Sequence, residues 1–195
     1  MGADMHLMID YDTASKPTEW GFLLSSQRRS VSPFKNSDRV LSLFETAISP
    51  PQDYRMFAAL AGVRADENEH PLFVPRGFPG VSSSEAFNEF HLCLVGDSER
   101  DRWPRDIRQS YANELVDKGV ARVVIPPGRA AAWLTDPSFH TPGWLTHQEI
   151  VASLDHCGYE RSELSVEFRI VLAAMDMLDQ EYGTDHSRLV FWFDN

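Results

Sequence analysis

The chain opens with polar and apolar residues in near alternation between positions 4 and 10. Successive side chains point to opposite faces of a β-strand, so Met5, Leu7 and Ile9 would lie on one face. The residues that would share the other face are Asp4, His6, Met8 and Asp10. A strand that is buried on one side and wet on the other gives this pattern, and so does a strand that carries a site. We predict a strand here and leave both explanations open.

Farther along the chain, apolar residues recur at steps of three and four, which is the spacing of a buried helix face. The segments with this spacing are 37–50, 53–62, 106–119, 146–156 and 159–182. Gly62 and Gly183 are placed to end two of these helices. Thr146 and Glu149 have the spacing of a capping box, which marks a helix start. The pattern therefore predicts about five helices, the last of which is the longest and should be central to the core.

Between the helices, apolar runs predict further strands, and breaker residues predict loops. The predicted strands are 90–95, 121–126 and 187–195. The predicted turn and loop regions are 13–21, 22–37, 64–80 and 126–149. The last of these is long for a loop and contains several aromatic residues, and loops of this length are uncommon unless they are functional.

These elements predict an α+β fold with mixed α/β element order, in which about five helices pack on a small mixed sheet. The chain has 195 residues, of which 43% are hydrophobic and 11% aromatic, enough to bury a sizeable core. We predict one globular domain spanning residues 1–195.

The net charge of −11 argues against direct nucleic-acid binding, because such affinity comes largely from Lys and Arg. The two cysteines, Cys93 and Cys157, form no CxxC pair, so the sequence suggests neither a disulfide framework nor a cysteine-rich zinc site. There is no run of eighteen apolar residues and no signal-peptide pattern at the N-terminus. We therefore expect a cytoplasmic protein that makes no membrane contact.

Three places could carry chemistry, and the first is the polar face of the opening strand. Asp4, His6 and Asp10 would share that face, and imidazole and carboxylate groups are ligands that suit zinc, manganese or iron. The same residues could equally form a solvated sheet face.

The other two places are the segment PSFHTPGWLT and the chain end VFWFDN. His140 lies on a proline-framed loop that could hold an imidazole still, although Phe139 and Trp144 could simply pin that loop to the core. Asp194 follows a strongly apolar strand and could bring a carboxylate to the end of a sheet, or it could belong to a frayed polar terminus.

Scattered blocks of the sequence resemble an uncharacterised family of bacteriophage and prophage proteins. The blocks are MGADMH, DYRMFAALAGVR, PRGFPGVS, FHTPGWLTHQE and VFWFDN, which together reach from one end of the chain to the other. The family pattern covers Asp4, His6, His140, Trp144 and Asp194. The resemblance implies a host bacterial cytosol as the location, and it carries no established activity.

Three positions depart from the family pattern. Ala3 stands where the family usually has Cys, so a thiolate there cannot be essential to this protein. Asp10 stands near a usual Glu, which keeps a carboxylate with a shorter reach. Pro142 replaces a second histidine that some relatives have, so the loop offers one imidazole.

The resemblance favours a sheet in which the first and last strands are neighbours. Asp4, His6 and Asp194 could then converge, and His140 could join them from the long loop. Two imidazoles and two carboxylates can hold one divalent ion with an open position for water, so we predict a zinc or manganese site with these four ligands. We also predict catalytic roles for His140 and Asp10.

The function predicted on this basis is metal-dependent hydrolysis, as by a phosphoesterase, of a nucleotide-like small molecule. The alternative is a non-catalytic counter-defence or host-takeover factor, which would bind a host protein through an acidic surface or sequester a nucleotide signal. On that alternative the His and Asp residues would be structural, and the acidic residues should gather on one face.

Overall fold

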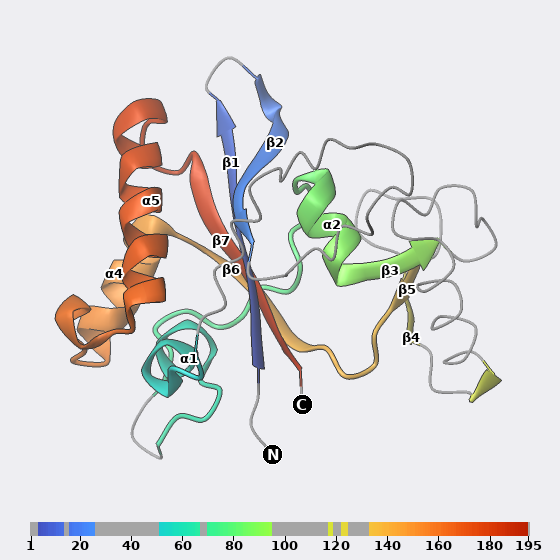
Figure 1. Cartoon of the computed structure of the whole chain (residues 1–195), viewed down its shortest axis with the longest axis horizontal. Coiled ribbons are helices and arrows are strands. Elements are labelled where there is room, and N and C mark those ends of the chain that lie inside the picture. The colour runs from blue at the N-terminus through green and yellow to red at the C-terminus, as the bar shows by residue number, and fades with distance from the viewer. Residues whose placement is uncertain are drawn as a thin grey trace, which may run out of the picture.

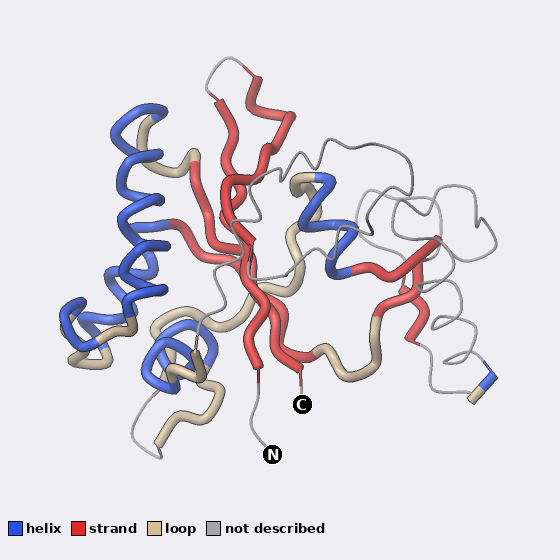
Figure 2. The backbone as a smooth tube through the Cα atoms, in the orientation of Figure 1, coloured by secondary structure: helices blue, strands red, loops and turns tan. Residues whose placement is uncertain are grey.

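The computed structural model describes residues 4–13, 16–25, 51–66, 70–94, 117–118, 122–124 and 133–194 (Figures 1 and 2). The helix predicted at 37–50 and nearly all of the helix predicted at 106–119 lie outside these residues.

A four-stranded sheet forms the centre of the described structure, in the order β2-β1-β7-β6. Its strands are β1 (Asp4–Thr13), β2 (Lys16–Ser25), β6 (His140–Thr146) and β7 (Ser187–Asp194). β1 and β7 pair in register from Asp4 opposite Asp194 to Tyr11 opposite Ser187. The α+β class and the neighbouring first and last strands are therefore confirmed. Each of the three pairings in this sheet is antiparallel, where the sequence predicted a mixed sheet.

Two strands of the central sheet were predicted as turn or loop. β2 occupies most of the predicted turn region and the start of the predicted connector, because its backbone pairs with the strongly strand-forming β1. β6 lies in the predicted loop at 126–149, where it pairs with β7 despite its Pro and Gly. Both strands are specified by their partners rather than by their own alternation.

Three helices cover one face of the central sheet, which Figure 1 shows with α5 and α4 beside β7 and β6. They are α1 (Tyr54–Ala61), α4 (His147–His156) and α5 (Val166–Tyr182). Gly62 ends α1 in the left-handed conformation, and Thr146 and Glu149 form the predicted capping box of α4. The sequence placed the start of α5 several residues too early. A short 3-10 helix, η2 (Arg161–Glu163), precedes it, and Ser165 caps its first turn.

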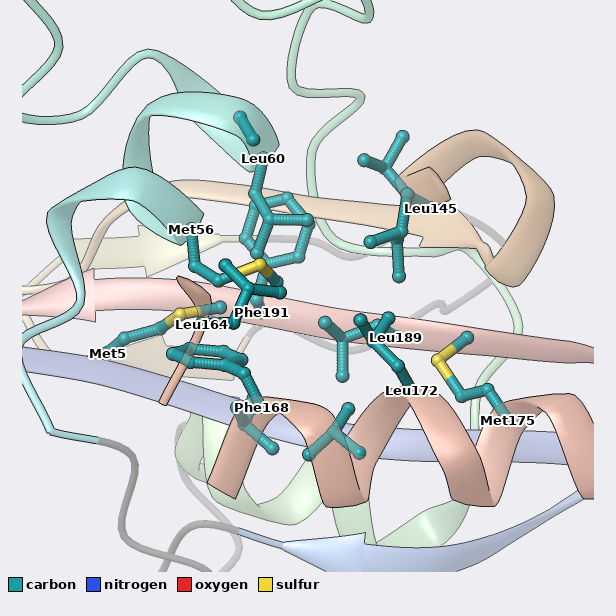
Figure 3. Close-up of a cluster of buried hydrophobic side chains, with 14 of the residues drawn as sticks. Met5, Met56, Leu60, Leu145, Leu164, Phe168, Leu172, Met175, Leu189 and Phe191 are labelled. Carbon is teal, nitrogen blue, oxygen red and sulfur yellow. The ribbon is translucent and has the colours of Figure 1, made fainter. Parts of the chain in front are cut away.

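The main core lies between these helices and the sheet (Figure 3). Met5 of β1 and Phe191 of β7 face Phe168 and Leu172 of α5, and Leu60 reaches the same cluster from α1. The strand residues among them, Met5 and Phe191, are at odd positions of β1 and β7, which share one face of the sheet.

The other face of the sheet is also buried, under α2 (Ser84–Phe90) and the segment 70–83. Met8, Val190 and Trp192 pack there against Phe90 and Phe139, and each of the first three is at most 1% exposed. The side chains at even positions of β1 are therefore buried from Met8 onward and do not form a solvent-exposed face. The sequence did not predict α2.

A second, three-stranded sheet has the order β3-β5-β4 and is antiparallel. Its strands are β3 (His91–Leu94), β4 (Arg122–Val124) and β5 (Trp133–Thr135). The strands predicted at 90–95 and 121–126 are therefore present, but β5, which lies in the predicted loop at 126–149, separates them. Among the described helices, none is both long enough and apolar enough to cross a membrane.

Gly143 marks a close approach between β6 and the core. A Cβ atom added at Gly143 would lie 2.7 Å from Cζ of Phe191, whose ring is 1% exposed. We expect Gly143→Ala to lower the free energy of unfolding by about 1–3 kcal/mol, because the packed ring has to move. Urea denaturation measures this change. Gly21→Ala is the matched control, since its Cβ would lie 3.3 Å from the Tyr11 ring, and an equal loss in both variants would contradict the prediction.

Candidate functional site

His6 and Asp194 meet at the ends of the paired first and last strands. Nε2 of His6 lies 2.9 Å from Oδ2 of Asp194, and the two side chains are 18% and 31% exposed. The His6 ring stacks on Trp192, with centroids 5.5 Å apart, and lies 5.2 Å from the Phe139 ring. An ionised carboxylate accepts hydrogen bonds only, so Nε2 of His6 donates to Asp194. The aromatic rings and the carboxylate together fix the position of a partly exposed imidazole.

A second polar chain starts at Asp4, directly opposite Asp194 in the strand pair. Nε2 of Gln52 donates to Oδ1 of Asp4 at 3.1 Å, and the hydroxyl of Tyr54 donates to Oε1 of Gln52 at 3.0 Å. The carboxylate can only accept, so it orients the Gln52 amide, and the amide orients the Tyr54 hydroxyl. We name Asp4, His6, Gln52, Tyr54 and Asp194 the strand-end cluster.

The cluster borders an open groove of about 520 Å³ at the start of α1. The groove is lined by Pro51, Gln52, Asp53, Tyr54, Arg55, Glu163, Leu164 and Ser165. Gln52 and Tyr54 belong both to the cluster and to this lining. The groove therefore gives a small ligand a place to bind beside Gln52, which contacts Asp4 at the end of β1.

His140 does not lie with His6. It is opposite Phe193 in the β6–β7 pair and stacks on that ring at 5.8 Å, whereas His6 is opposite Trp192. Residues opposite each other share a face, and Phe193 and Trp192 are on different faces. His140 is thus on the helix-covered face, and its buried Nε2 has no hydrogen-bond partner among the described residues.

The predicted metal centre is not assembled by this geometry. In the part of the chain that the structure describes, no three His, Cys, Asp or Glu side chains are grouped so that they could hold a metal ion. His140 is separated from His6 and Asp194 by the sheet, and Asp4 is engaged by Gln52. The four residues as placed do not fit a zinc or manganese ion.

Asp10, for which we predicted a catalytic role, is completely buried. Its two carboxylate oxygens accept from the hydroxyl of Ser83 at 2.7 Å and from the Ser83 backbone N–H at 3.1 Å. Arg188, opposite Asp10 in the strand pair, donates from Nη2 at 3.3 Å. Burial raises the pKa of Asp10, although the bonds from Ser83 and the charge of Arg188 lower it in part. This position favours a structural role, in which Asp10 ties β1 to the cap of α2.

Arg188 also belongs to a stack of cations and aromatic rings. Its guanidinium carbon lies 3.7 Å from the centroid of the Trp20 ring and 5.5 Å from that of Trp144. Arg76 lies over Trp144 at 4.6 Å and forms an ion pair with Glu149. The stack joins β2, β7, β6 and the segment 70–83, and it explains Trp144, whose role the sequence left open, as a packing residue.

Another histidine–aspartate pair, which the sequence did not predict, is nearly buried beside the groove between α4 and α5. Nδ1 of His147 lies 3.1 Å from Oδ2 of Asp179, and Nη2 of Arg161 lies 2.7 Å from Nε2 of His147. Arginine can only donate, so Nε2 of His147 accepts and Nδ1 donates to Asp179. Ser187 donates to the same carboxylate at 2.9 Å. In the sequence, this pair was indicated only by His147, which directly follows the N-cap residue Thr146. Its partners Asp179 and Ser187 are distant in sequence and could not be assigned to it.

No family model, no curated protein and no solved structure matches the chain.

Proposed function

We propose that the protein is a hydrolase that cleaves a phosphoester bond in a nucleotide-like small molecule at the strand-end cluster. The observation that carries this proposal is the 2.9 Å contact between the partly exposed His6 imidazole and Asp194. A histidine oriented by a carboxylate is a recurring arrangement in general acid–base catalysis. His6 and Asp194 do not line the groove at the start of α1, but Gln52 and Tyr54 of the same cluster do.

In the proposed reaction, the His6 imidazole accepts a proton from a water molecule as that water attacks phosphorus. The bond from phosphorus to the leaving oxygen breaks, and the leaving oxygen takes a proton from solvent. The imidazolium that forms is stabilised by the Asp194 carboxylate and later returns its proton to solvent. A positioned base of this kind contributes about 10²–10⁴ to a rate.

The groove at the start of α1 would take the nucleoside part of the substrate. The Tyr54 side chain is 45% exposed and offers a ring on which a base can stack. Asp4 and Gln52 present hydrogen-bonding groups that suit ribose hydroxyls. With the nucleoside held there, the phosphate would extend past Asp4 at the end of β1 toward His6.

The proposed steps use no metal ion, since the described residues do not form a fitting set of ligands. A bound zinc or manganese ion stays a prediction from the sequence. Elemental analysis of the purified protein and of His6→Ala tests it, and equal metal content in the two would contradict His6 as a ligand.

The test of the proposed function is a substrate panel of nucleoside monophosphates, diphosphates and triphosphates, cyclic nucleotides and dinucleotides. Chromatography measures product formation, and at least one member of the panel should be hydrolysed. Tyr54→Ala should raise the KM for that member about tenfold with kcat nearly unchanged, because it removes binding that is equal in substrate and transition state. Leu72→Ala, at another exposed apolar residue, should change neither constant. Absence of turnover for every panel member would overturn the proposal.

A further inference from the structure

Helix α5 has a second apolar face, which points away from the sheet. Its buried side is formed by Phe168, Val171, Leu172, Met175 and Leu178, three of which appear in or beside the core of Figure 3. On the opposite side, Val166, Ile170 and Met177 are 52%, 48% and 70% exposed, and Ala173 is exposed between them. These four residues follow steps of four, three and four, so they form one line along the helix. We name them the outer stripe of α5.

A helix that packs against a core on one side needs no apolar residues on the other. Of the eight large hydrophobic residues that are exposed among the described residues, three belong to the outer stripe. The remaining five are Leu23, Tyr54, Leu72, Val74 and Val81, which lie outside α5. A contiguous apolar surface of this kind, when polar residues border it, is typical of an interaction site.

The border of the outer stripe is acidic. At 100° per residue, Glu167 and Glu181 lie along one side, and Asp176 lies along the other with Arg169 as a single base. On the Asp176 side the surface continues into an open groove of about 500 Å³ between α4 and α5. Its lining includes Asp155, Asp176 and Asp179, and the lining contains no Lys or Arg. The outer stripe and the acidic groove therefore lie side by side.

We propose that the outer stripe and the adjoining groove bind a basic amphipathic helix of a partner protein. The apolar side of that helix would lie on Val166, Ile170 and Met177, and its Lys or Arg side chains would reach Asp155 and Asp176 in the groove. This is the helix-in-groove mode of recognition, with charge complementarity setting the choice of partner. α5 has 17 residues and is about 25 Å long, which is enough for three to four turns of a partner helix.

Charge disfavours a second copy of this chain as the occupant. Two α5 helices packed antiparallel about a two-fold axis bring the same flank of each copy together. The flank that carries Glu167 and Glu181 would then meet the same acidic flank of the other copy, and on the groove side each copy would bring a single cation, Arg169, toward the three aspartates of the other.

A fluorescein-labelled 18-residue peptide, with Leu on one helical face and Lys on the other, is a suitable probe. Its affinity for the full-length protein is measured by fluorescence anisotropy at physiological salt. Met177→Ser and the double variant Asp155→Asn/Asp176→Asn should each weaken binding about tenfold or more, which corresponds to about 1.4 kcal/mol. A peptide of the same composition with Leu and Lys scrambled should bind the wild type more weakly by a similar factor.

The matched controls are Val74→Ser, at a residue 79% exposed outside α5, and Asp117→Asn, at an exposed acid elsewhere. Both should bind the peptide as the wild type does. Unchanged affinity in the stripe and groove variants, equal losses in the controls, or no binding at all would overturn the proposal. Sedimentation analysis gives a further check: a wild-type dimer that Met177→Ser converts to monomer would show that a second copy covers the stripe, and would also overturn it.

Discussion

Replacement of Arg188 by Met should lower the free energy of unfolding by about 3–5 kcal/mol at neutral pH, because Asp10 would remain buried without its cation. Asp10 is 0% exposed, and the Arg188 side chain is 9% exposed. The substitution also removes the hydrogen bond from Arg188 to the carbonyl of Val81 and the contact with the Trp20 ring. Arg188 thus connects β7, β1, β2 and the segment before α2, and each of these contacts would be lost together.

The effect of Arg188→Met should depend on pH. Burial raises the pKa of Asp10 above its ordinary value of 3.8, so the folded state binds this proton more tightly than the unfolded state. The stability contributed by this group is therefore present below 3.8 and is lost as the pH rises through the folded pKa. Removal of Arg188 takes away a positive charge that lowers the pKa of Asp10. The pKa of Asp10 then rises further, so the loss of folding stability continues to higher pH.

Urea denaturation of the wild type and Arg188→Met at pH 4 and pH 7 measures this dependence. The variant should be less destabilised at pH 4, where Asp10 more readily carries a proton. The double variant Arg188→Met/Asp10→Asn is the control, since it removes the buried charge and should recover at least half of the loss. A destabilisation that is equal at both pH values and unrelieved in the double variant would contradict a buried ion pair as the cause.

For the nucleotide that the protein turns over, His6→Gln and Asp194→Asn should each lower kcat by about 10²–10⁴. His6→Gln takes away the base, and Asp194→Asn takes away the carboxylate charge that stabilises the imidazolium. The two residues act as a unit, so the double variant should be little worse than the more severe single variant. Steady-state kinetics with the double-mutant cycle measures this coupling.

His156→Gln is the control for these variants, because His156 is exposed on α4 away from the strand ends. It should keep the wild-type kcat. Additive losses at His6 and Asp194, or a loss in His156→Gln of similar size, would show that the two residues do not form a catalytic pair.

Helices α1, α4 and α5 could be predicted because their information is local, whereas the pairing of β1 with β7 was expected from the family resemblance. The apolar spacing of α5, the capping box of α4 and Gly62 after α1 each act within a few residues of sequence. The nearness of His6 to Asp194 followed from placing the first and last strands side by side, which the structure confirms.

The face on which His140 lies could not be predicted in the same way. A register irregularity lies between His140 and Gly143 in the β6–β7 pair, and a shift of one residue moves every side chain to the other face. Nothing in the segment PSFHTPGWLT specifies that irregularity. The prediction of a four-ligand centre did not anticipate this irregularity. Two strands can be neighbours in a sheet while particular side chains on them lie on opposite faces.

The burial of Asp10 could not be predicted from the sequence either. The alternation of β1 indicates which residues share a face, but not what covers that face. Ser83 and α2 come more than seventy residues later, and they turn the polar side of the strand into a second packed layer. The same local pattern thus gives a buried ion pair at Asp10 and a partly exposed pair at His6.

NMR of the imidazole signals tests whether the substrate binds at the strand-end cluster. The chain has seven histidines, each of which gives its own Cε1–H signal, and single His→Gln variants assign them. On addition of a non-hydrolysable analogue of the nucleotide that is turned over, the signal of His6 should shift while those of His147 and His156 stay in place. Shifts at His147, beside the groove between α4 and α5, without any at His6 would contradict substrate binding at the strand-end cluster.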